Sequence, residues 1–318
     1  MTEPQAPLWT LDSVVLDGDG RPRLEVDQLE IVAGRTAVIG ASAAGKTSLL
    51  NLLVGFETAS HGQLANRISS DSNRLPLFWI PPDGGLWPQA TVAGHLQAVM
   101  PAGKTQRSVD ERLEAFGLAD RANARPGELS AGERARLAAA RGLAAEARVL
   151  VADEPLVHVD PARLEGDWNT LVDDAQNHQT SLVFSTHSPE QVLRHADHVV
   201  VLAQGKVVAQ GDVASLYHEP PSREVANSLG LANWFDALET AAWGVGDGTR
   251  DICLRPEEIA LVPEADGPAE VLDSKTIGAI RETRLELLEM PDQRVLRHLA
   301  DPTREVPTGT VRIVTRTE

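Results

Sequence analysis

Near its start the chain alternates apolar and polar positions, and this pattern predicts two half-buried strands. The alternation covers residues 8–16 and 24–32, and a period of two places every second side chain on the same face of a sheet. Between the two stretches stands Asp17-Gly18-Asp19-Gly20, a sequence that favours a tight turn. We therefore expect an antiparallel, hairpin-like β layer ahead of the first core strand.

Further along, the pattern changes to continuous apolar runs, which predict strands covered on both faces. These runs lie at residues 36–39, 77–80, 148–152 and 181–186. Stretches with helical periodicity lie between them, at residues 48–54, 91–125 and 131–145 and from residue 161 onward. Strands that alternate with helices predict an α/β fold with a mainly parallel sheet. The antiparallel β layer and a helical subdomain at about residues 83–145 would be added to this sheet.

The pattern changes again near residue 236, where the helical signal fades. Short strand-like runs follow at residues 252–255, 258–262, 281–288 and 310–314. Such a succession predicts a small second domain that is all-β and barrel-like. We place the domains at residues 1–235 and 236–318, with the connecting segment at 219–230.

The strongest chemical signal directly follows the first apolar run. Residues 40–47 fit the phosphate-binding pattern G-x-x-x-x-G-K-[ST], between a predicted strand and a predicted helix. The members are Gly40, Ala41, Ser42, Ala43, Ala44, Gly45, Lys46 and Thr47, with Ser48 next on the helix. Backbone N–H groups would cradle the phosphates, Lys46 would reach the β- and γ-phosphates, and the Thr47 hydroxyl would hold Mg²⁺. The alternative is a strand-to-helix turn that binds nothing.

Polar residues also follow two later apolar runs. Asp153 and Glu154 follow the run at 148–152, and His187 follows the run at 181–186. Ligands of such sheets bind beyond the carboxyl ends of the strands, where the phosphate loop lies as well. Taken alone, the two acids are typical of a turn and His187 of an ordinary strand end. Beside a phosphate loop, we expect all three to belong to one site.

Composition and charge narrow the function without changing the fold. The 318 residues carry a net charge of −17, which argues against a nucleic-acid partner and against electrostatic binding to anionic lipid. No apolar run of roughly 18 residues suggests a membrane span, and the first residues do not have the pattern of a secretory signal. A single cysteine, Cys253, excludes an internal disulfide framework and suits a reducing cytoplasm.

One more motif, Leu129-Ser130-Ala131-Gly132-Glu133, opens the helix at 131–145 with a capping box. The order of phosphate loop, this motif, the two acids and His187 resembles the ATP-binding cassette (ABC) ATPases. Residues 129–133 are similar to that family's signature sequence, Leu-Ser-Gly-Gly-Gln, with changes at the third and fifth positions. The resemblance covers about residues 8–230.

The resemblance implies a role for each element. Asp153 would hold Mg²⁺ beside Thr47, Glu154 would act as general base on the attacking water, and His187 would stabilise the transferred phosphate. In the family, the signature of one subunit closes over ATP held by another. The residues that would bind ATP in trans are Ser130, Ala131, Gly132, Glu133 and Asp160. Because the chain has one phosphate loop and one signature, the resemblance implies a homodimer that forms on binding ATP and Mg²⁺.

The end of the first predicted domain resembles importer-type cassettes. Residues 196–212 and 216–230 are similar to importers that carry an oligonucleotide-binding-like (TOBE) accessory domain, and residues 254–259 are similar to a recognisable segment of that domain. The resemblance implies an importer's ATPase subunit, bound to a separate integral-membrane permease at the cytoplasmic face of the inner or plasma membrane. The solute would be ferric iron, sulfate, molybdate, a polyamine or a sugar.

One departure from the family concerns coupling to the permease. Pro82 stands where the family places a glutamine that contacts Mg²⁺ and the attacking water. Gln89 lies seven residues later and does not fit that position. The departure favours an alternative function, a regulatory or degenerate nucleotide-binding subunit with weak coupling. A third possibility, an ABC protein acting on DNA or ribosomes, conflicts with the acidic charge.

Two further departures concern the nucleotide itself. Leu16 or Asp17 stands where the family stacks an aromatic ring on adenine, and the nearest aromatic residue, Trp9, fits a strand position. Ala43 replaces a common glycine of the phosphate loop. We expect its methyl group to be tolerated if the residue keeps a negative φ.

Overall fold

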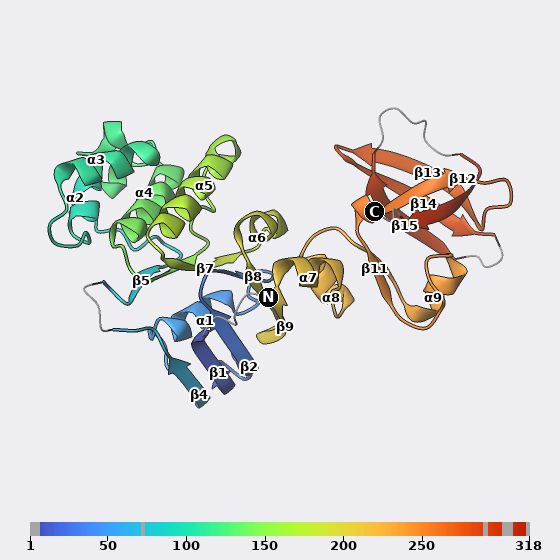
Figure 1. Cartoon of the computed structure of the whole chain (residues 1–318), viewed down its shortest axis with the longest axis horizontal. Coiled ribbons are helices and arrows are strands. Elements are labelled where there is room, and N and C mark those ends of the chain that lie inside the picture. Colours follow the sequence, from blue (N-terminus) through green and yellow to red (C-terminus); the bar gives the residue numbers. More distant parts are fainter. Residues whose placement is uncertain (1–6, 71–73, 289–291, 301–307, 316–318) are drawn as a thin grey trace. The chain divides into compact units, whose positions relative to one another are not determined.

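The structure of the chain is a computed structural model that describes residues 7–70, 74–288, 292–300 and 308–315. It separates into two compact units, one that extends through Val213 and one that begins at Ala214. The first unit is built on a nine-stranded sheet (Figure 1). Its strands are β1 (Pro7–Leu16), β2 (Leu24–Val32), β3 (Arg35–Ile39), β4 (His61–Asn66), β5 (Leu77–Ile80), β6 (Val149–Asp153), β7 (Ser181–Thr186), β8 (His198–Ala203) and β9 (Lys206–Asp212).

The strand order of this sheet is β4-β1-β2-β9-β8-β3-β7-β6-β5. The five strands from β8 to β5 are parallel, whereas β1 pairs antiparallel with β2 from Leu16↔Leu24 outward. Both the parallel core and the antiparallel layer that the sequence predicts are confirmed. Strand β4 was not predicted, because nearly all its residues are exposed and an exposed edge strand lacks the apolar alternation.

Helices cover the sheet of the first unit. They are α1 (Lys46–Leu53), α2 (Val92–Gln97), α3 (Gln106–Ala115), α4 (Ala131–Ala144), α5 (Pro161–Asn177) and α6 (Pro189–His195), with short 3₁₀ turns at Ala119–Arg121 and Pro126–Glu128. Helix α1 contacts β6 and β7, and its leucines belong to one hydrophobic core with residues of β1, β6 and β7. Helices α2, α3 and α4 pack on one another between β5 and β6 in the chain, as the predicted helical subdomain requires.

The second unit consists mainly of antiparallel strands. A short pair, β10 (Asn233–Phe235) and β11 (Ile252–Leu254), accompanies a five-stranded sheet in the order β12-β16-β13-β14-β15. The strands of this sheet are β12 (Ile259–Pro263), β13 (Ala269–Ile277), β14 (Ile280–Leu287), β15 (Gln293–Leu299) and β16 (Thr310–Thr315). Its helical elements are the end of α7 (Val213–His218), α8 (Arg223–Ser228), α9 (Ala237–Ala242) and a 3₁₀ turn at Pro256–Glu258.

The four strand-like runs that the sequence shows after residue 250 all form strands, but β13, β15 and α9 were not predicted. Strand β13 is exposed or half-buried along most of its length, with Ala269 its only buried residue. It is held by pairing with β14 and β16. Because β13 has almost no buried side chains, its own sequence carries no apolar alternation, and its partners determine where it lies.

The second unit begins before the boundary that we placed at 235/236, and the side chain of Arg255 gives the reason. Arg255 is fully buried, and its guanidinium donates to the carbonyls of Tyr217 (2.9 and 2.8 Å), Ala226 (3.0 Å) and Leu231 (3.0 Å). It also lies 4.0 Å from the centroid of the Tyr217 ring. Because these contacts hold the connecting segment against β11, helix α8 packs as part of the second unit.

No helix in the described part of the chain is long and apolar enough to cross a membrane.

Candidate nucleotide-binding site

The phosphate-binding pattern forms the loop between β3 and α1, and two of its glycines are required by the geometry. A Cβ atom at Gly40 would lie 2.3 Å from the carbonyl oxygen of Leu202, which backbone packing does not permit. Gly45 has φ +103 and a Cβ there would lie 3.3 Å from the carbonyl of Arg23, so the left-handed conformation and the close approach both favour glycine. The loop is further fixed by a hydrogen bond from the Gly205 N–H to the Ala44 carbonyl (3.1 Å).

Ala43 does not meet the condition that we set for its methyl group. Its φ is +62, in the left-handed region. For a residue other than glycine this conformation costs roughly 1–2 kcal/mol. The methyl group is therefore accommodated at a cost, and the loop stores backbone strain at this position.

Lys46 points its ammonium group into the loop. The Nζ atom donates to the carbonyls of Gly40 (2.8 Å) and Ala41 (3.2 Å) and lies 3.6 Å from Oε1 of Glu154. Only 8 % of the side chain is exposed. A compact cation held in this way, beside the N-terminus of α1, suits a phosphate group.

Asp153 and Glu154, which we call the acid pair, stand at the carboxyl end of β6. The Thr47 hydroxyl donates to Oδ2 of Asp153 at 2.6 Å, so the two residues predicted to hold Mg²⁺ face each other. Hydroxyl and carboxylate oxygens are the donors that Mg²⁺ prefers, and Mg²⁺ commonly takes its remaining ligands from substrate phosphates and water. The donor set therefore fits a magnesium ion bound with a nucleotide.

Glu154 brings the other predicted residues together. Its carboxylate lies between Lys46 and His187, with Oε2 3.3 Å from Nδ1 of His187. The His187 side chain is 60 % exposed and that of Glu154 28 %. Glu154 itself has φ +46, again in the left-handed region. A carboxylate that is partly open to solvent and flanked by a cation and an imidazole can orient and polarise a water molecule.

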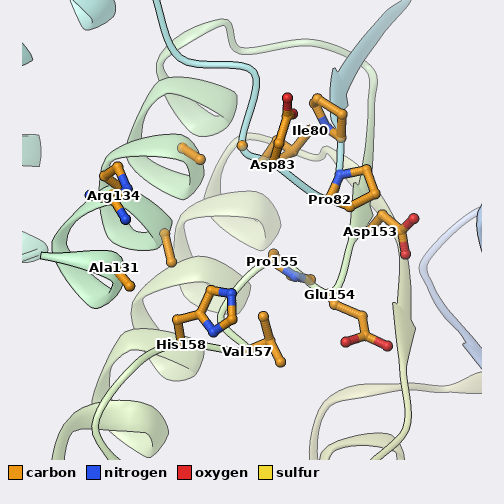
Figure 2. A pocket seen from close by; sticks show the side chains of 14 residues that line it. Ile80, Pro82, Asp83, Ala131, Arg134, Asp153, Glu154, Pro155, Val157 and His158 are labelled. Carbon is orange, nitrogen blue, oxygen red and sulfur yellow. The ribbon is translucent and has the colours of Figure 1, made fainter. Parts of the chain in front are cut away.

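A pocket of about 230 Å³ opens beside the acid pair. Figure 2 shows Pro82 and Asp83 on the loop after β5 and the acid pair at the end of β6, all lining this pocket. The segment that lines it from the β5 side is Ile80-Pro81-Pro82-Asp83-Gly84, which contains no amide side chain. Pro82 therefore lines the same pocket as Asp153 and Glu154.

The loop at 81–91, which follows β5, is held by three side chains that we call the aromatic clamp: Arg141, Trp87 and His95. Arg141 is buried in α4, donates to the carbonyls of Gly84 (2.9 Å) and Gly85, and lies 5.0 Å from the centroid of the Trp87 ring. Trp87 in turn stacks on His95, with ring centroids 5.2 Å apart and planes at 13°.

His95 takes part in the clamp as a neutral ring. Its Nε2 accepts from the Trp87 N–H (2.9 Å), while Nδ1 lies 2.7 Å from the carbonyl of Thr91 and is therefore the protonated nitrogen. His95 is fully buried, and burial, together with the nearby charge of Arg141, lowers its pKa. Protonation of Nε2 would remove the acceptor for Trp87.

The signature-like residues form the N-terminus of α4. The Ser130 hydroxyl accepts from the Glu133 N–H (3.1 Å), and Glu133 accepts from the Ser130 N–H (2.8 Å), so the predicted capping box is confirmed. This hydrogen bond from Ser130 lowers the pKa of Glu133. Gly132 is packed closely, because a Cβ there would lie 3.0 Å from the carbonyl of His158.

Asp160 caps the next helix. Its side chain accepts from the Ala162 N–H (2.8 Å) at the start of α5, and the residue is exposed. Ala131 lines the pocket beside the acid pair, whereas among the described residues no hydrogen bond or ion pair joins Ser130–Glu133 or Asp160 to the phosphate loop.

On the adenine side, the strand assignment of Trp9 is confirmed. Trp9 is fully buried in β1, and Leu16 at the end of the same strand is 4 % exposed. Neither side chain is available to stack on a base. Asp17 is exposed and accepts a side-chain hydrogen bond from Arg23 through its carbonyl (3.0 Å).

Reasoning from the sequence missed two residues at this site. Ser185, the fifth residue of β7, donates to Oδ1 of Asp153 and accepts from the Glu154 N–H (3.0 Å). Arg141 is the centre of the aromatic clamp. Each of the two is a polar residue inside a stretch that is otherwise apolar or alanine-rich. Because a buried polar side chain requires hydrogen-bond partners, this exception to the pattern was the signal for both residues.

Comparison with known proteins now identifies the family. Residues 25–157 match the family described as ABC transporter. The chain is 33 % identical to a sulfate/thiosulfate import ATP-binding protein of Gloeobacter violaceus, over 76 % of this chain and 73 % of the relative. It is 31 % identical to an Fe(3+) ions import ATP-binding protein of Pectobacterium atrosepticum, over 75 % and 70 %. A molybdenum import ATP-binding protein of Methylococcus capsulatus is 35 % identical, over 59 % of this chain and only 56 % of the relative.

Solved structures agree on the fold. The ATP-binding subunit of an ABC transporter superposes with a TM-score of 0.56 at 20 % identity, and covers 70 % of this chain and 99 % of that one. A bacterial Atm1-family ABC exporter with ATP bound gives a TM-score of 0.58 at 23 % identity, over 70 % of this chain and 41 % of that one. Together with the geometry of the phosphate loop and the acid pair, these similarities show that the chain belongs to the ABC transporter family, among its import ATP-binding proteins.

Proposed function

We propose that this chain hydrolyses Mg-ATP as a homodimer and drives solute import through a separate integral-membrane permease. The observation that carries the proposal is the connected set of side chains around Glu154. The carboxylate of Glu154 lies 3.6 Å from Lys46 and 3.3 Å from His187. Asp153 precedes Glu154 in the chain and accepts a hydrogen bond from Thr47. The backbone N–H of Glu154 donates to Ser185, which also contacts Asp153. These are the residue types that phosphoryl transfer to water requires, in hydrogen-bond or ion-pair reach of one another.

In this proposal each residue has a separate task. The loop N–H groups and Lys46 bind the β- and γ-phosphates, while Thr47 and Asp153 hold Mg²⁺, which neutralises charge on the phosphates. Glu154 orients the attacking water and accepts its proton. His187, which lies 3.3 Å from Glu154, donates toward the γ-phosphate oxygens as their charge develops.

The proposal includes a second copy of the chain. Ser130, Ala131, Gly132 and Glu133 lie at the N-terminus of α4, and Asp160 lies at that of α5. A helix N-terminus attracts phosphate oxygens. With one phosphate loop and one signature in the chain, two copies would complete two ATP sites.

The solute, the accessory domain and the location follow by similarity. Relatives named for molybdenum, sulfate/thiosulfate and Fe(3+) support an inorganic ion ahead of a polyamine or a sugar. The second unit would be the TOBE-like accessory domain, and its β-rich fold supports that assignment. We place the chain at the cytoplasmic face of the membrane, held by the permease, with no nucleic-acid partner, since the charge is −17.

The test is turnover by the purified full chain. Wild type should release phosphate from Mg-ATP. Glu154→Gln should reduce turnover by at least about a hundredfold and should still form a dimer with ATP. Equal turnover by wild type and Lys46→Ala would contradict the proposal.

One observation favours the alternative of a weakly coupled subunit. Pro82 offers no hydrogen bond at the pocket, and the aromatic clamp fixes the loop around it. The two functions separate when the permease is reconstituted with the chain in lipid vesicles. Strong stimulation of turnover by the permease supports the coupled importer. Stimulation that appears only with Pro82→Gln supports the weakly coupled subunit.

A further inference from the structure

We propose that Ser185 is a positioning residue for hydrolysis, which holds both members of the acid pair through one hydroxyl group. The inference rests on the proposed ATPase function. Ser185 lies on β7 in parallel register beside Asp153 of β6. It is fully buried. Its Oγ donates to Oδ1 of Asp153 and accepts from the backbone N–H of Glu154 at 3.0 Å.

The first consequence concerns the carboxylate of Asp153. Its two oxygens accept from different hydroxyls, Oδ2 from Thr47 at 2.6 Å and Oδ1 from Ser185. Two donors on opposite oxygens fix the rotation of the carboxylate, and hydrogen bonds to a charged acceptor are the stronger kind. Ser185 therefore fixes the direction in which Asp153 presents its remaining lone pairs to Mg²⁺.

The second consequence concerns the backbone of Glu154. This residue has φ +46, a conformation that side-chain-bearing residues rarely adopt. Such a conformation persists where the surroundings fix it. The Ser185 hydroxyl is the partner of the Glu154 N–H. In this geometry the Glu154 carboxylate reaches Lys46 at 3.6 Å and His187 at 3.3 Å.

The geometry of β7 distinguishes the role of Ser185 from a contribution to packing alone. Successive side chains of a strand point to opposite faces, so Ser185 and His187 lie on the side of the acid pair, and Thr186 points away. Thr186 is also buried, and its hydroxyl also makes two hydrogen bonds, to Gln191 (2.6 Å) and from the Ser188 N–H (3.0 Å). The two hydroxyls are matched in burial and bonding, but only that of Ser185 contacts the acid pair.

A serine at this place also conflicts with the local pattern. The neighbours Leu182, Val183 and Phe184 are fully buried apolar residues, and strands favour β-branched and aromatic residues. Burial of a hydroxyl is unfavourable unless it is hydrogen-bonded. The acid pair supplies both bonds, which accounts for a polar residue in this strand.

The experiment compares Ser185→Ala with Thr186→Ala in the full chain. For Ser185→Ala we expect the kcat for ATP to fall about tenfold, as for a lost hydrogen bond to a buried charged group. The Mg²⁺ concentration that gives half-maximal turnover should rise several-fold, while binding of a fluorescent ATP analogue in EDTA stays at the wild-type level. Thr186→Ala should leave the Mg²⁺ requirement unchanged, although both variants lose a buried hydroxyl and should unfold at lower denaturant concentrations.

A second variant protects the test against poor folding. Ser185→Cys keeps the shape of the side chain with a weaker donor, and it should raise the Mg²⁺ requirement less than Ser185→Ala does. A wild-type Mg²⁺ requirement in both Ser185 variants, or an equal rise in Thr186→Ala, would overturn the proposal while the ATPase function stands. If wild type and Lys46→Ala hydrolyse ATP equally, the proposed function fails instead, and the role of Ser185 fails with it.

Discussion

Two groups of residues lie close to the acid pair, and they are held in different ways. On one side, Lys46, Thr47 and the acid pair contact one another through charged and hydroxyl side chains. On the other side, the loop at 81–91 is held by hydrogen bonds that Arg141 donates to its carbonyls and by the stacking of Trp87 on His95. The first arrangement can perform chemistry on a phosphate. The second contains no group that could, but it fixes the backbone firmly.

In the proposed importer, ATP hydrolysis and its coupling to the permease would therefore depend on different sets of residues. The residues proposed for chemistry keep hydrogen-bond partners of suitable type, whereas Pro82 lies on a loop that is held by Arg141 and by the stack of Trp87 on His95. Four measurements test this contrast between the residues proposed for chemistry and the loop at 81–91.

The largest effect should come from the chemical side. His187→Ala removes the imidazole beside Glu154, and loss of one stabilising donor in a transition state costs about 10²–10³ in turnover. Phosphate release by the full chain measures this. His61→Ala, an exposed histidine on the edge strand β4, is the control and should turn over normally. Equal rates in the two variants would remove His187 from the proposed mechanism.

The next effect should come from the clamp, and it should appear in stability. Arg141→Leu leaves the Gly84 and Gly85 carbonyls without their donors and removes the cation from Trp87, so we expect the free energy of unfolding to fall by about 3 kcal/mol. Arg107→Ala, at an 87 % exposed side chain, should change it by less than about 0.5 kcal/mol. Urea unfolding measures both, and similar losses would contradict a special role for the clamp.

A smaller effect should appear with pH. Burial lowers the pKa of His95, so the unfolded chain binds its proton more readily, and the stability that the neutral ring provides is lost as pH falls below about 6.5 toward the lowered folded value. One proton changes the free energy of unfolding by at most about 1.4 kcal/mol per pH unit. His195, whose pKa burial also lowers, contributes in the same direction. In His95→Gln, the free energy of unfolding should therefore fall less steeply than in wild type between pH 7.5 and 5.5, while His195 keeps part of the slope. An unchanged slope would contradict the assignment of a neutral ring to His95.

The smallest effect should come from the strained phosphate loop. Ala43→Gly relieves a left-handed alanine and should raise the free energy of unfolding by about 0.5–1 kcal/mol. Ala44→Gly is the matched control, since Ala44 is not among the residues with positive φ and is buried. It should lower stability. Urea unfolding midpoints measure the stability of both variants. If both variants were more stable than wild type, relief of strain at Ala43 would not be the reason.

The sequence allowed prediction of the parts whose signal is local. The spacing of Gly40, Gly45 and Lys46 and the apolar run before Asp153 are short patterns, and the structure brings these residues together. The same is true of Ser130 and its capping box.

What could not be predicted depends on contacts between distant residues. Ser185 acquires its partners from β6, and Arg141 acquires its partners from a loop 56 and 57 positions earlier in the chain. Strand β4 forms because β1 presents a free edge to it. The left-handed φ of Ala43 is a property of the folded loop that the residue type alone does not indicate.

Arg255 has a consequence for anyone who would transplant the second unit. A chimaera joined at residue 236 would keep the guanidinium but discard the carbonyls of Tyr217, Ala226 and Leu231, to which it donates. The graft would lose the acceptors and the Tyr217 ring that surround this cation in the intact chain, and the guanidinium would have to be solvated instead. A transferable module has to start at Ala214, where the compact unit itself starts.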